Sequence, residues 1–434
     1  MRTVLVTGPG GAGRTTIAAA SALAAAKRGD RTLLLTTEPT DDLLGTATGS
    51  DLAEPAGITD GLWAVRVDTG AHFRTELLAF QERAAAVLSM LGARELAGEE
   101  LTELPGSEEF ALLHALHRAS DGDWDVLVVD LPPLRDALAL LALPEQLRRY
   151  LRRLVPRERQ AARALRPMMA QLAGVPMPSQ WLYETVARRD AELAAVQSLL
   201  AAPSTSLRLV AEPGPAAQES LRTARTGAAL FGLRVDTLVA NRLLPRGSVD
   251  PWLATLAAQQ QKTLEDWYGE WPADGVSLCE VGHLGRDPHG VGDLVLLDLE
   301  SDCTAFGGTG SGAAGAAGAG AGGAAAGGGL SEGDGLAVER DSGQPVPSSA
   351  PWRVEDRIAE EDLLVWVLPL PGAVKSDVKL VRRDDELLLT VGPFRRIVAL
   401  PSALRRCTVT GAALTDGELR VRFSPDPGLW PRTD

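Results

Sequence analysis

Residues 8–16 read Gly8-Pro9-Gly10-Gly11-Ala12-Gly13-Arg14-Thr15-Thr16. They lie between an apolar run with strand character, Thr3–Thr7, and an alanine-rich run with helical character, Thr15–Arg28. Glycines let successive backbone N–H groups converge on phosphate oxygens, and the helix that follows presents its positive end to them. A strand, a glycine-rich turn and a helix in this order predict a phosphate-binding loop. A glycine-rich turn without a ligand is the alternative interpretation.

The side chains of this loop suggest how ATP and Mg²⁺ would be held. Thr15 is placed to offer its hydroxyl to Mg²⁺, and Arg14 occupies the position where the usual loop has lysine. The predicted nucleotide-binding residues of the loop are Gly8, Gly10, Gly11, Ala12, Gly13, Arg14, Thr15 and Thr16.

Two acidic residues complete the predicted site. The apolar run Trp124–Asp130 ends in a carboxylate that we expect beside Mg²⁺, directly or through water. An aspartate that only ends a strand and caps the next element is the other interpretation. Glu38 follows a second predicted strand, Arg31–Thr36, where a mobile loop could approach the terminal phosphate.

Further strands and helices alternate along the first 300 residues. Ser206–Ala211 and Val235–Ala240 are continuous apolar runs separated by helical patterns. Such an alternation predicts an α/β fold with a parallel sheet covered on both faces. Between about residues 138 and 202 the pattern is helical and contains prolines, which predicts a helical insertion.

The end of the chain has a different character. Residues 307–329 are almost entirely glycine and alanine, which behave as a flexible coil. We therefore expect a body at 1–300, a linker at 301–350 and a small domain at 351–434. Short strands separated by Pro, Gly and Asp predict an antiparallel β-sandwich there; they are Leu363–Leu368, Asp377–Leu380, Leu387–Val391, Ile397–Ala399 and Leu419–Phe423.

Composition excludes several classes of protein. The 434 residues carry a formal charge of −14, which disfavours a nucleic-acid partner. Three scattered cysteines without a CxxC motif exclude a disulfide framework and a thiolate zinc cage. No apolar run approaches the roughly 20 residues that span a bilayer. Together these features predict a cytoplasmic protein without a transmembrane segment.

The body resembles the ArsA/Get family, the arsenical-pump ATPases and the ATPases that target tail-anchored proteins. The likeness rests on the phosphate loop, on the Glu38-Pro39 and Asp130-Leu131-Pro132 segments, and on the terminal residues 283–288. The resemblance implies a Mg²⁺-dependent ATPase in which Glu38 positions the attacking water and Arg14 stabilises the phosphates. It also implies that Asn241 reads the adenine edge.

This sequence departs from the family pattern at positions that matter for chemistry. The lysine that crosses a dimer interface is Pro9 here, and proline supplies neither charge nor an N–H group. Arg14 replaces the other loop lysine, and a planar guanidinium is not equivalent to a compact ammonium. Losing one transition-state donor costs about 10²–10³ in rate. We therefore expect nucleotide binding with slow or lost ATP hydrolysis, and whether the chain is an enzyme stays open.

The tail resembles the α-crystallin domain of small heat-shock proteins. The likeness rests on Leu368–Gly372, Leu387–Thr390 and Asp416–Val421. Together the two resemblances imply an ATP-dependent switch, binding ATP or ADP, that controls a hydrophobic protein client. The alternative is a nucleotide-independent pseudo-ATPase that acts as a holdase or scaffold through its insertion and tail. A partition-type regulator is a third hypothesis, against which the Gly307–Gly329 tract and the tail argue, and a homodimer without a zinc clasp stays open.

Three other features have competing interpretations. The methionines of residues 168–177 suit an apolar client groove or ordinary core packing. His114 and His117 share a helix face and suggest a metal site only if a third ligand is near. The arginines at 148, 149, 152, 153 and 157 form a solvated face or meet an acidic partner.

Overall fold

The computed structural model describes residues 1–434 except 91–93, 95, 155–179, 300–302, 305–351 and 431–434. Its N-terminal part is built on a nine-stranded sheet in the order β3-β4-β2-β5-β1-β6-β7-β8-β9. The strands are β1 (Arg2–Thr7), β2 (Thr32–Thr36), β3 (Ala56–Thr59), β4 (Leu62–Arg66), β5 (Val126–Asp130), β6 (Thr205–Ala211), β7 (Val235–Leu243), β8 (Ser277–Gly282) and β9 (Cys303–Thr304).

The sheet is parallel from β4 to β8, and only its edge strands β3 and β9 pair antiparallel. Its central strands are buried because helices cover both faces, which explains their continuous apolar sequences. The predicted parallel α/β sheet is therefore confirmed. The short strands β3, β4, β8 and β9 are not among the sequence predictions.

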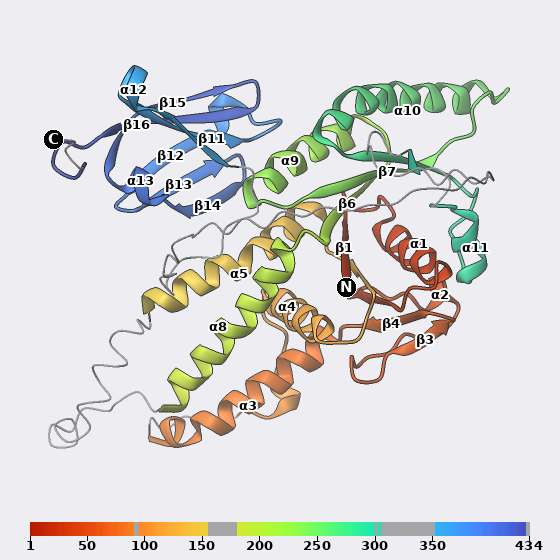
Figure 1. Cartoon of the computed structure of the whole chain (residues 1–434). Helices are drawn as coiled ribbons and strands as arrows, with labels where there is room; N and C mark the ends of the chain where they lie inside the picture. The colour runs from red at the N-terminus through yellow and green to blue at the C-terminus, as the bar shows by residue number, and fades with distance from the viewer. Residues whose placement is uncertain (91–93, 95, 155–179, 300–302, 305–351, 431–434) are drawn as a thin grey trace, which may run out of the picture.

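Helices form a layer on each side of the sheet (Figure 1). One face is covered by α1 (Arg14–Lys27), α2 (Asp41–Leu44) and α11 (Gly290–Leu296). The other is covered by α4 (Ser107–Ser120), α5 (Leu134–Leu154), α9 (Pro215–Phe231) and α10 (Pro251–Glu270). The short 3-10 helices are η1 (Gly98–Glu100), η2 (Pro272–Asp274) and η3 (Lys375–Asp377).

Long helices also extend away from the sheet (Figure 1). In the predicted insertion, about residues 138–202, the described residues form most of α5 and all of α8 (Gln180–Ala201). Residues 155–179 lie outside the described part of the chain. The earlier helix α4 packs against both α8 and α3 (Thr69–Met90). The helical region therefore draws on more of the chain than the expected segment.

The C-terminal part is a sandwich of two antiparallel sheets, as predicted. One has the order β10-β11-β16-β15 and the other β12-β13-β14. Its elements are β10 (Arg353–Arg357), α12 (Ile358–Glu361), β11 (Leu363–Pro369), β12 (Val378–Arg383), β13 (Glu386–Val391), β14 (Phe394–Ala399), α13 (Ser402–Arg405), β15 (Cys407–Thr415) and β16 (Glu418–Pro425). The glycine-alanine tract lies outside the described residues.

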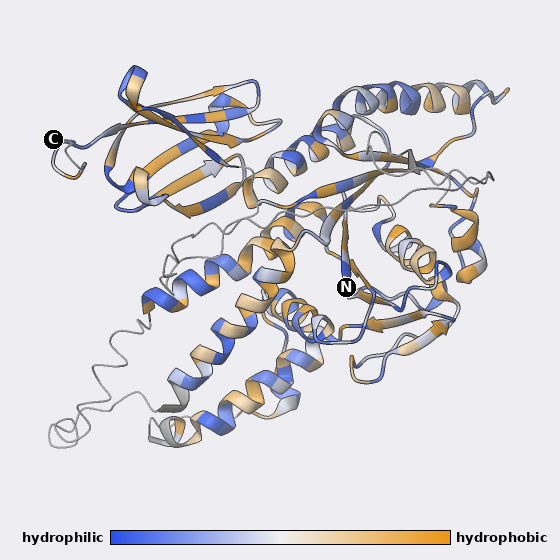
Figure 2. Ribbon diagram, viewed as in Figure 1, coloured by the Kyte–Doolittle hydropathy of each residue, from blue (hydrophilic) through white to orange (hydrophobic). Residues whose placement is uncertain are grey.

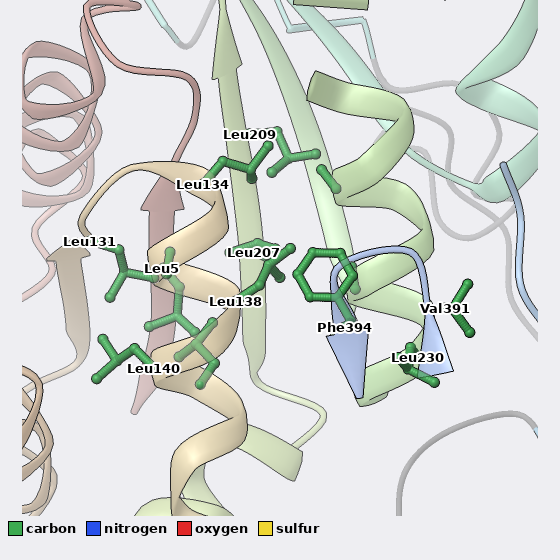
Figure 3. Packing of buried hydrophobic residues seen from close by; sticks show 14 of the residues in the cluster. Leu5, Leu131, Leu134, Leu138, Leu140, Leu207, Leu209, Leu230, Val391 and Phe394 are labelled. Carbon is green, nitrogen blue, oxygen red and sulfur yellow. The ribbon is translucent and has the colours of Figure 1, made fainter. Parts of the chain in front are cut away.

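Hydrophobic residues are concentrated along the strands and along the helices that cover them (Figure 2). The buried cluster between the sheet and α4, α5 and α9 continues without a break into the C-terminal sandwich. Figure 3 shows part of this cluster, with Leu5 and Leu138 on one side and Phe394 on the other. No helix among the described residues is long and apolar enough to cross a membrane.

Candidate functional site

The loop between β1 and α1 has the backbone conformation that the sequence predicts. Gly11 and Gly13 have φ of 79° and 86°, in the left-handed region that favours glycine. Gly13 is the N-cap of α1 and has no side chain that could cap the helix. The first N–H groups of α1 therefore face the loop, as an anion site at a helix N-terminus requires.

Two glycines of the loop are also set by space. A Cβ on Gly8 would lie 1.9 Å from the carbonyl oxygen of Val210 in β6, and one on Gly13 would lie 2.3 Å from the amide nitrogen of Asn241. Gly10 has open space around it. The loop thus sits against β6 and the end of β7 at Gly8 and Gly13, whereas Gly10 is not packed.

The end of β7 holds the loop through its backbone carbonyls. The Asn241 amide is buried and donates to the carbonyl of Ala12 at 2.8 Å. Arg242, at a φ of 59°, donates from its guanidinium to the carbonyl of Gly11 at 2.8 Å. Asn241 is therefore a support of the phosphate loop, and its contact with adenine stays a prediction. Arg242 is a loop contact that sequence reasoning missed; its place directly after Asn241 was the available signal.

Asp130 ends β5 inside the protein beside this loop. Its side chain is 2 % exposed, and Oδ2 accepts a hydrogen bond from the Thr36 hydroxyl at 3.0 Å. Oδ1 is buried and has no hydrogen-bond partner among the described residues. Burial raises the pKa of Asp130 to about 6 and the charge of Glu38 adds to the effect, whereas the nearby Thr15 and Thr36 hydroxyls and Arg14 oppose it.

These groups fit a magnesium ion. Mg²⁺ prefers oxygen ligands and commonly takes one or two from the protein, with the rest from water and phosphate. The unpaired Oδ1 of Asp130 and the nearby Thr15 hydroxyl are such ligands. Asp130 would hold the ion or its water shell, and Thr15 would coordinate it. When bound, Mg²⁺ would neutralise the charge of the phosphate oxygens.

Arg14 points toward the segment that follows β5. Its guanidinium donates to the carbonyl oxygen of Leu131. The Leu131 amide in turn donates to Val6 of β1 at 2.9 Å, and the Leu134 amide donates to the carbonyl of Gly8 at 3.0 Å. The residue in the lysine position thus ties the start of α1 to the residues between β5 and α5.

Glu38 lies just beyond β2 and is exposed. Its backbone amide donates to the Thr36 hydroxyl at 3.0 Å, and the same hydroxyl donates to Asp130. Thr36 therefore links the two acidic positions, which are 92 residues apart in the chain. The sequence did not single out Thr36, which reads as one more residue of a buried strand.

The other candidate groups have different surroundings. His114 stacks on His72 of α3 with ring centroids 4.8 Å apart, and burial lowers the pKa of both rings. Among the described residues no three His, Cys, Asp or Glu side chains are grouped to hold a metal. The segment 168–177 and Arg157 lie outside the described residues.

Three arginines of α5 are paired within the chain. Arg148 forms an ion pair with Asp190 of α8 at 3.0 Å. Arg149 and Arg153 contact Glu386 of the C-terminal sandwich at 2.6 and 2.8 Å. The acidic partner of this stripe is thus, in part, the chain's own C-terminal domain.

Comparison with known proteins identifies both parts of the chain. Residues 1–280 match the family model described as anion-transporting ATPase. Residues 361–423 match the HSP20-like domain found in ArsA.

Several relatives align with this chain over nearly their whole length. An uncharacterized protein of Streptomyces coelicolor is 52 % identical over 435 residues, covering 100 % of both chains. A protein of Mycobacterium tuberculosis is 31 % identical over 99 % of this chain and 97 % of its own. A putative arsenical pump-driving ATPase of Aquifex aeolicus is 23 % identical over 98 % of this chain and 100 % of its own. The phosphate loop, the parallel sheet and these matches together show that the chain belongs to the ArsA family of anion-transporting ATPases and carries the family's HSP20-like domain.

Proposed function

We propose that the chain binds Mg²⁺ and ATP in the phosphate loop and uses binding, more than rapid hydrolysis, to switch its surface between two states. One observation carries the proposal. Arg14, in place of the loop lysine, is hydrogen-bonded to the Leu131 carbonyl next to Asp130. A phosphate that attracts Arg14 would compete with this hydrogen bond. Phosphate binding in the loop would therefore change the contacts of the residues after β5.

The chemistry of the site supports binding better than turnover. Phosphoryl transfer depends on positioning and on preorganised positive charge. The glycine backbone, Thr15 and Asp130 keep the binding elements, whereas Arg14 and Pro9 stand where the family pattern has lysine. Glu38 would orient the attacking water with a longer side chain than aspartate. Slow or absent hydrolysis follows.

The proposed client surface lies on the helices beyond the sheet. Large apolar side chains are exposed there at Phe80 of α3, Phe110 of α4, and Tyr150 and Leu154 of α5. Exposed apolar patches commonly mark interaction sites. The methionine-rich sequence 168–177 lies outside the described residues, and its flexible thioethers are of a kind that suits an apolar client. A hydrophobic protein segment is the client that such a surface fits.

Titration calorimetry of the purified chain with Mg·ATP and Mg·ADP tests the proposal, with phosphate release followed on the same sample. We expect micromolar binding with little release. Thr15→Ala should weaken binding that depends on Mg²⁺, whereas Arg14→Lys should raise the rate of release because it restores a compact ammonium. Ordinary turnover that disappears in Arg14→Ala would show that arginine is an adequate substitute and would overturn the slow-hydrolysis part.

A nucleotide-independent holdase is the second candidate, and the match of residues 361–423 to an HSP20-like domain favours it. Suppression of aggregation of an unfolded test protein separates the two. Equal suppression with and without Mg·ATP would favour the holdase, and a nucleotide-dependent difference would favour the switch.

A further inference from the structure

The C-terminal sandwich is held on α5 by a cluster of ionic contacts, which we name the clamp: Glu145, Arg149 and Arg153 of α5 with Glu386 and Arg396 of the sandwich. Arg149 meets Glu386 through two parallel hydrogen bonds of 3.0 and 2.6 Å. Arg153 adds a third at 2.8 Å. These contacts hold the pKa of Glu386 below its usual range, so its carboxylate stays charged at neutral pH. Figure 2 shows the hydrophilic end of α5 that supplies the arginines.

Arg396 extends the clamp to the neighbouring helix α9. Only 7 % of this residue is exposed, and its guanidinium lies 3.1 Å from Glu145. It also donates to the carbonyl of Leu230 at 2.6 Å, in the last turn of α9, where helix carbonyls lack internal partners. The ring of Trp352 lies over the same guanidinium at 4.7 Å. A buried arginine whose guanidinium contacts a carboxylate, a helix carbonyl and an aromatic ring indicates a specific interface.

Apolar and neutral contacts complete the attachment. Phe394 of β14 lies against Phe231 with ring centroids 5.8 Å apart, and it occupies the space that a Cβ on Gly227 would need (Figure 3). Thr226 and Arg222 of α9 donate to the carbonyls of Pro371 and Gly372, each at 2.8 Å. The sandwich is thus attached to the same two helices by charge, shape and backbone contacts.

The opposite end of α5 begins at the phosphate loop. Leu134, its first residue, donates to Gly8, and the preceding Leu131 accepts from Arg14. From there α5 runs about 20 to 30 Å to Arg149 and Arg153 of the clamp. A single helix therefore contacts both the predicted nucleotide site and the C-terminal domain.

We propose that docking of the HSP20-like domain on α5 and α9 is coupled to the conformation of residues 131–134, so that this domain is a regulated module of the same chain. A change at residues 131–134 displaces the first turn of α5, and the helix transmits the displacement to Arg149 and Arg153. In the nucleotide arm, which rests on the proposed function, a phosphate that draws Arg14 from Leu131 loosens the clamp. Two sites that bias one packed element share a coupling free energy.

Hydrogen exchange on the nucleotide-free, full-length chain tests the coupling itself. Glu386→Arg places a third cation against Arg149 and Arg153, and we expect exchange to rise at least tenfold both in β14 and in residues 131–138. Glu360→Arg, at an exposed position of α12, makes the same charge change as a control and should alter neither segment. The pair Arg149→Glu with Glu386→Arg should restore protection at both ends. A rise confined to β14, or no rise there, would overturn the proposal.

Calorimetry with Mg·ATP tests the nucleotide arm. If ATP loosens the clamp, a variant that is already undocked binds ATP more tightly by the same factor, and we expect at least about fivefold for Glu386→Arg over the wild type. Arg152→Glu, an exposed charge reversal on α5, should leave the affinity unchanged. Equal affinities in wild type and Glu386→Arg would overturn the nucleotide arm. Absence of binding in both would overturn the proposed function together with this arm, and the exchange result would still decide the coupling.

Discussion

The phosphate loop and the clamp are two polar regions built in opposite ways. The loop consists of nine consecutive residues whose main chain makes the site, with Asn241 and Arg242 supporting it from β7. The clamp joins side chains that are far apart in the chain, since Arg149 and Glu386 are separated by 237 residues. The difference shows that a site built from backbone can be read in a short motif, whereas a site built from distant charges emerges only on folding.

The first prediction concerns the backbone side of this comparison and has the largest expected effect. Gly8→Ala places a Cβ 1.9 Å from the carbonyl oxygen of Val210, where backbone must move. We expect a loss of about 3 kcal/mol or more in the free energy of unfolding, measured with urea. Gly10→Ala, with open space around it, is the matched control and should change stability by less than about 0.5 kcal/mol. Equal stability of the two variants would mean that the loop is not packed against β6.

Asp130→Asn should stabilise the nucleotide-free protein at pH 7.5. The folded protein keeps the Asp130 proton up to about pH 6, while the unfolded chain loses it near the ordinary value of 3.8. The unfolding free energy of the wild type therefore falls as pH rises through this window. The difference between these two pKa values corresponds to about 3 kcal/mol of unfolding free energy. The asparagine variant would not lose this stability.

The comparison of the two proteins at pH 4 and pH 7 isolates this group from the other carboxyls. Asp60→Asn, at an exposed turn, controls for the general effect of removing a negative charge. If the difference in unfolding free energy between wild type and Asp130→Asn does not widen as pH rises, Asp130 is solvated in the folded protein.

Arg396→Ala tests the clamp, of which Arg396 is the most buried residue. The change removes the hydrogen bond to Leu230 and the ion pair with Glu145, and it removes the packing under Trp352. We expect unfolding to become easier by about 2 kcal/mol, because a helix carbonyl is left without its partner. The exposed neighbour Arg395 supplies the control variant Arg395→Ala. If the two alanine variants have the same free energy of unfolding, the buried Arg396 side chain adds no net stability.

The smallest expected effect is that of Thr226→Val. Its hydroxyl lies 2.8 Å from the Pro371 carbonyl across the interface and 3.2 Å from the Arg222 carbonyl within α9, and valine keeps the shape while losing both contacts. A neutral hydrogen bond contributes about 1 kcal/mol, so a loss of that size is expected in urea unfolding. Thr223→Val on the same helix, where the hydroxyl donates to Glu219 of α9 itself, is the comparison. A larger loss of unfolding free energy for Thr223→Val would show that these hydroxyls stabilise α9 itself more than the interface.

Much of the fold could be predicted because its signals are local. The strands β1, β2, β5, β6 and β7 are apolar runs, and the loop before α1 has glycine where φ is positive. The strand β10 (Arg353–Arg357) was missed because four of its five residues are charged, so this edge strand has no apolar run. In the site, Asp130 was predicted from its place at the end of an apolar run, which is β5. Arg242 was missed: its place after Asn241 indicates only that it lies near the loop, and its contact with Gly11 depends on which strand lies beside β6.

The sequence by itself determined the phosphate loop, the parallel sheet and the separate β-sandwich, since hydrophobic periodicity and glycine placement act over a few residues. Tertiary structure alone decided where Arg14 points, which groups surround Asp130, and that the arginines of α5 meet Glu386. Long charged side chains can pair with any opposite charge within reach. Which charge is within reach depends on how α5, α9 and the sandwich pack, and no short stretch of residues encodes that arrangement.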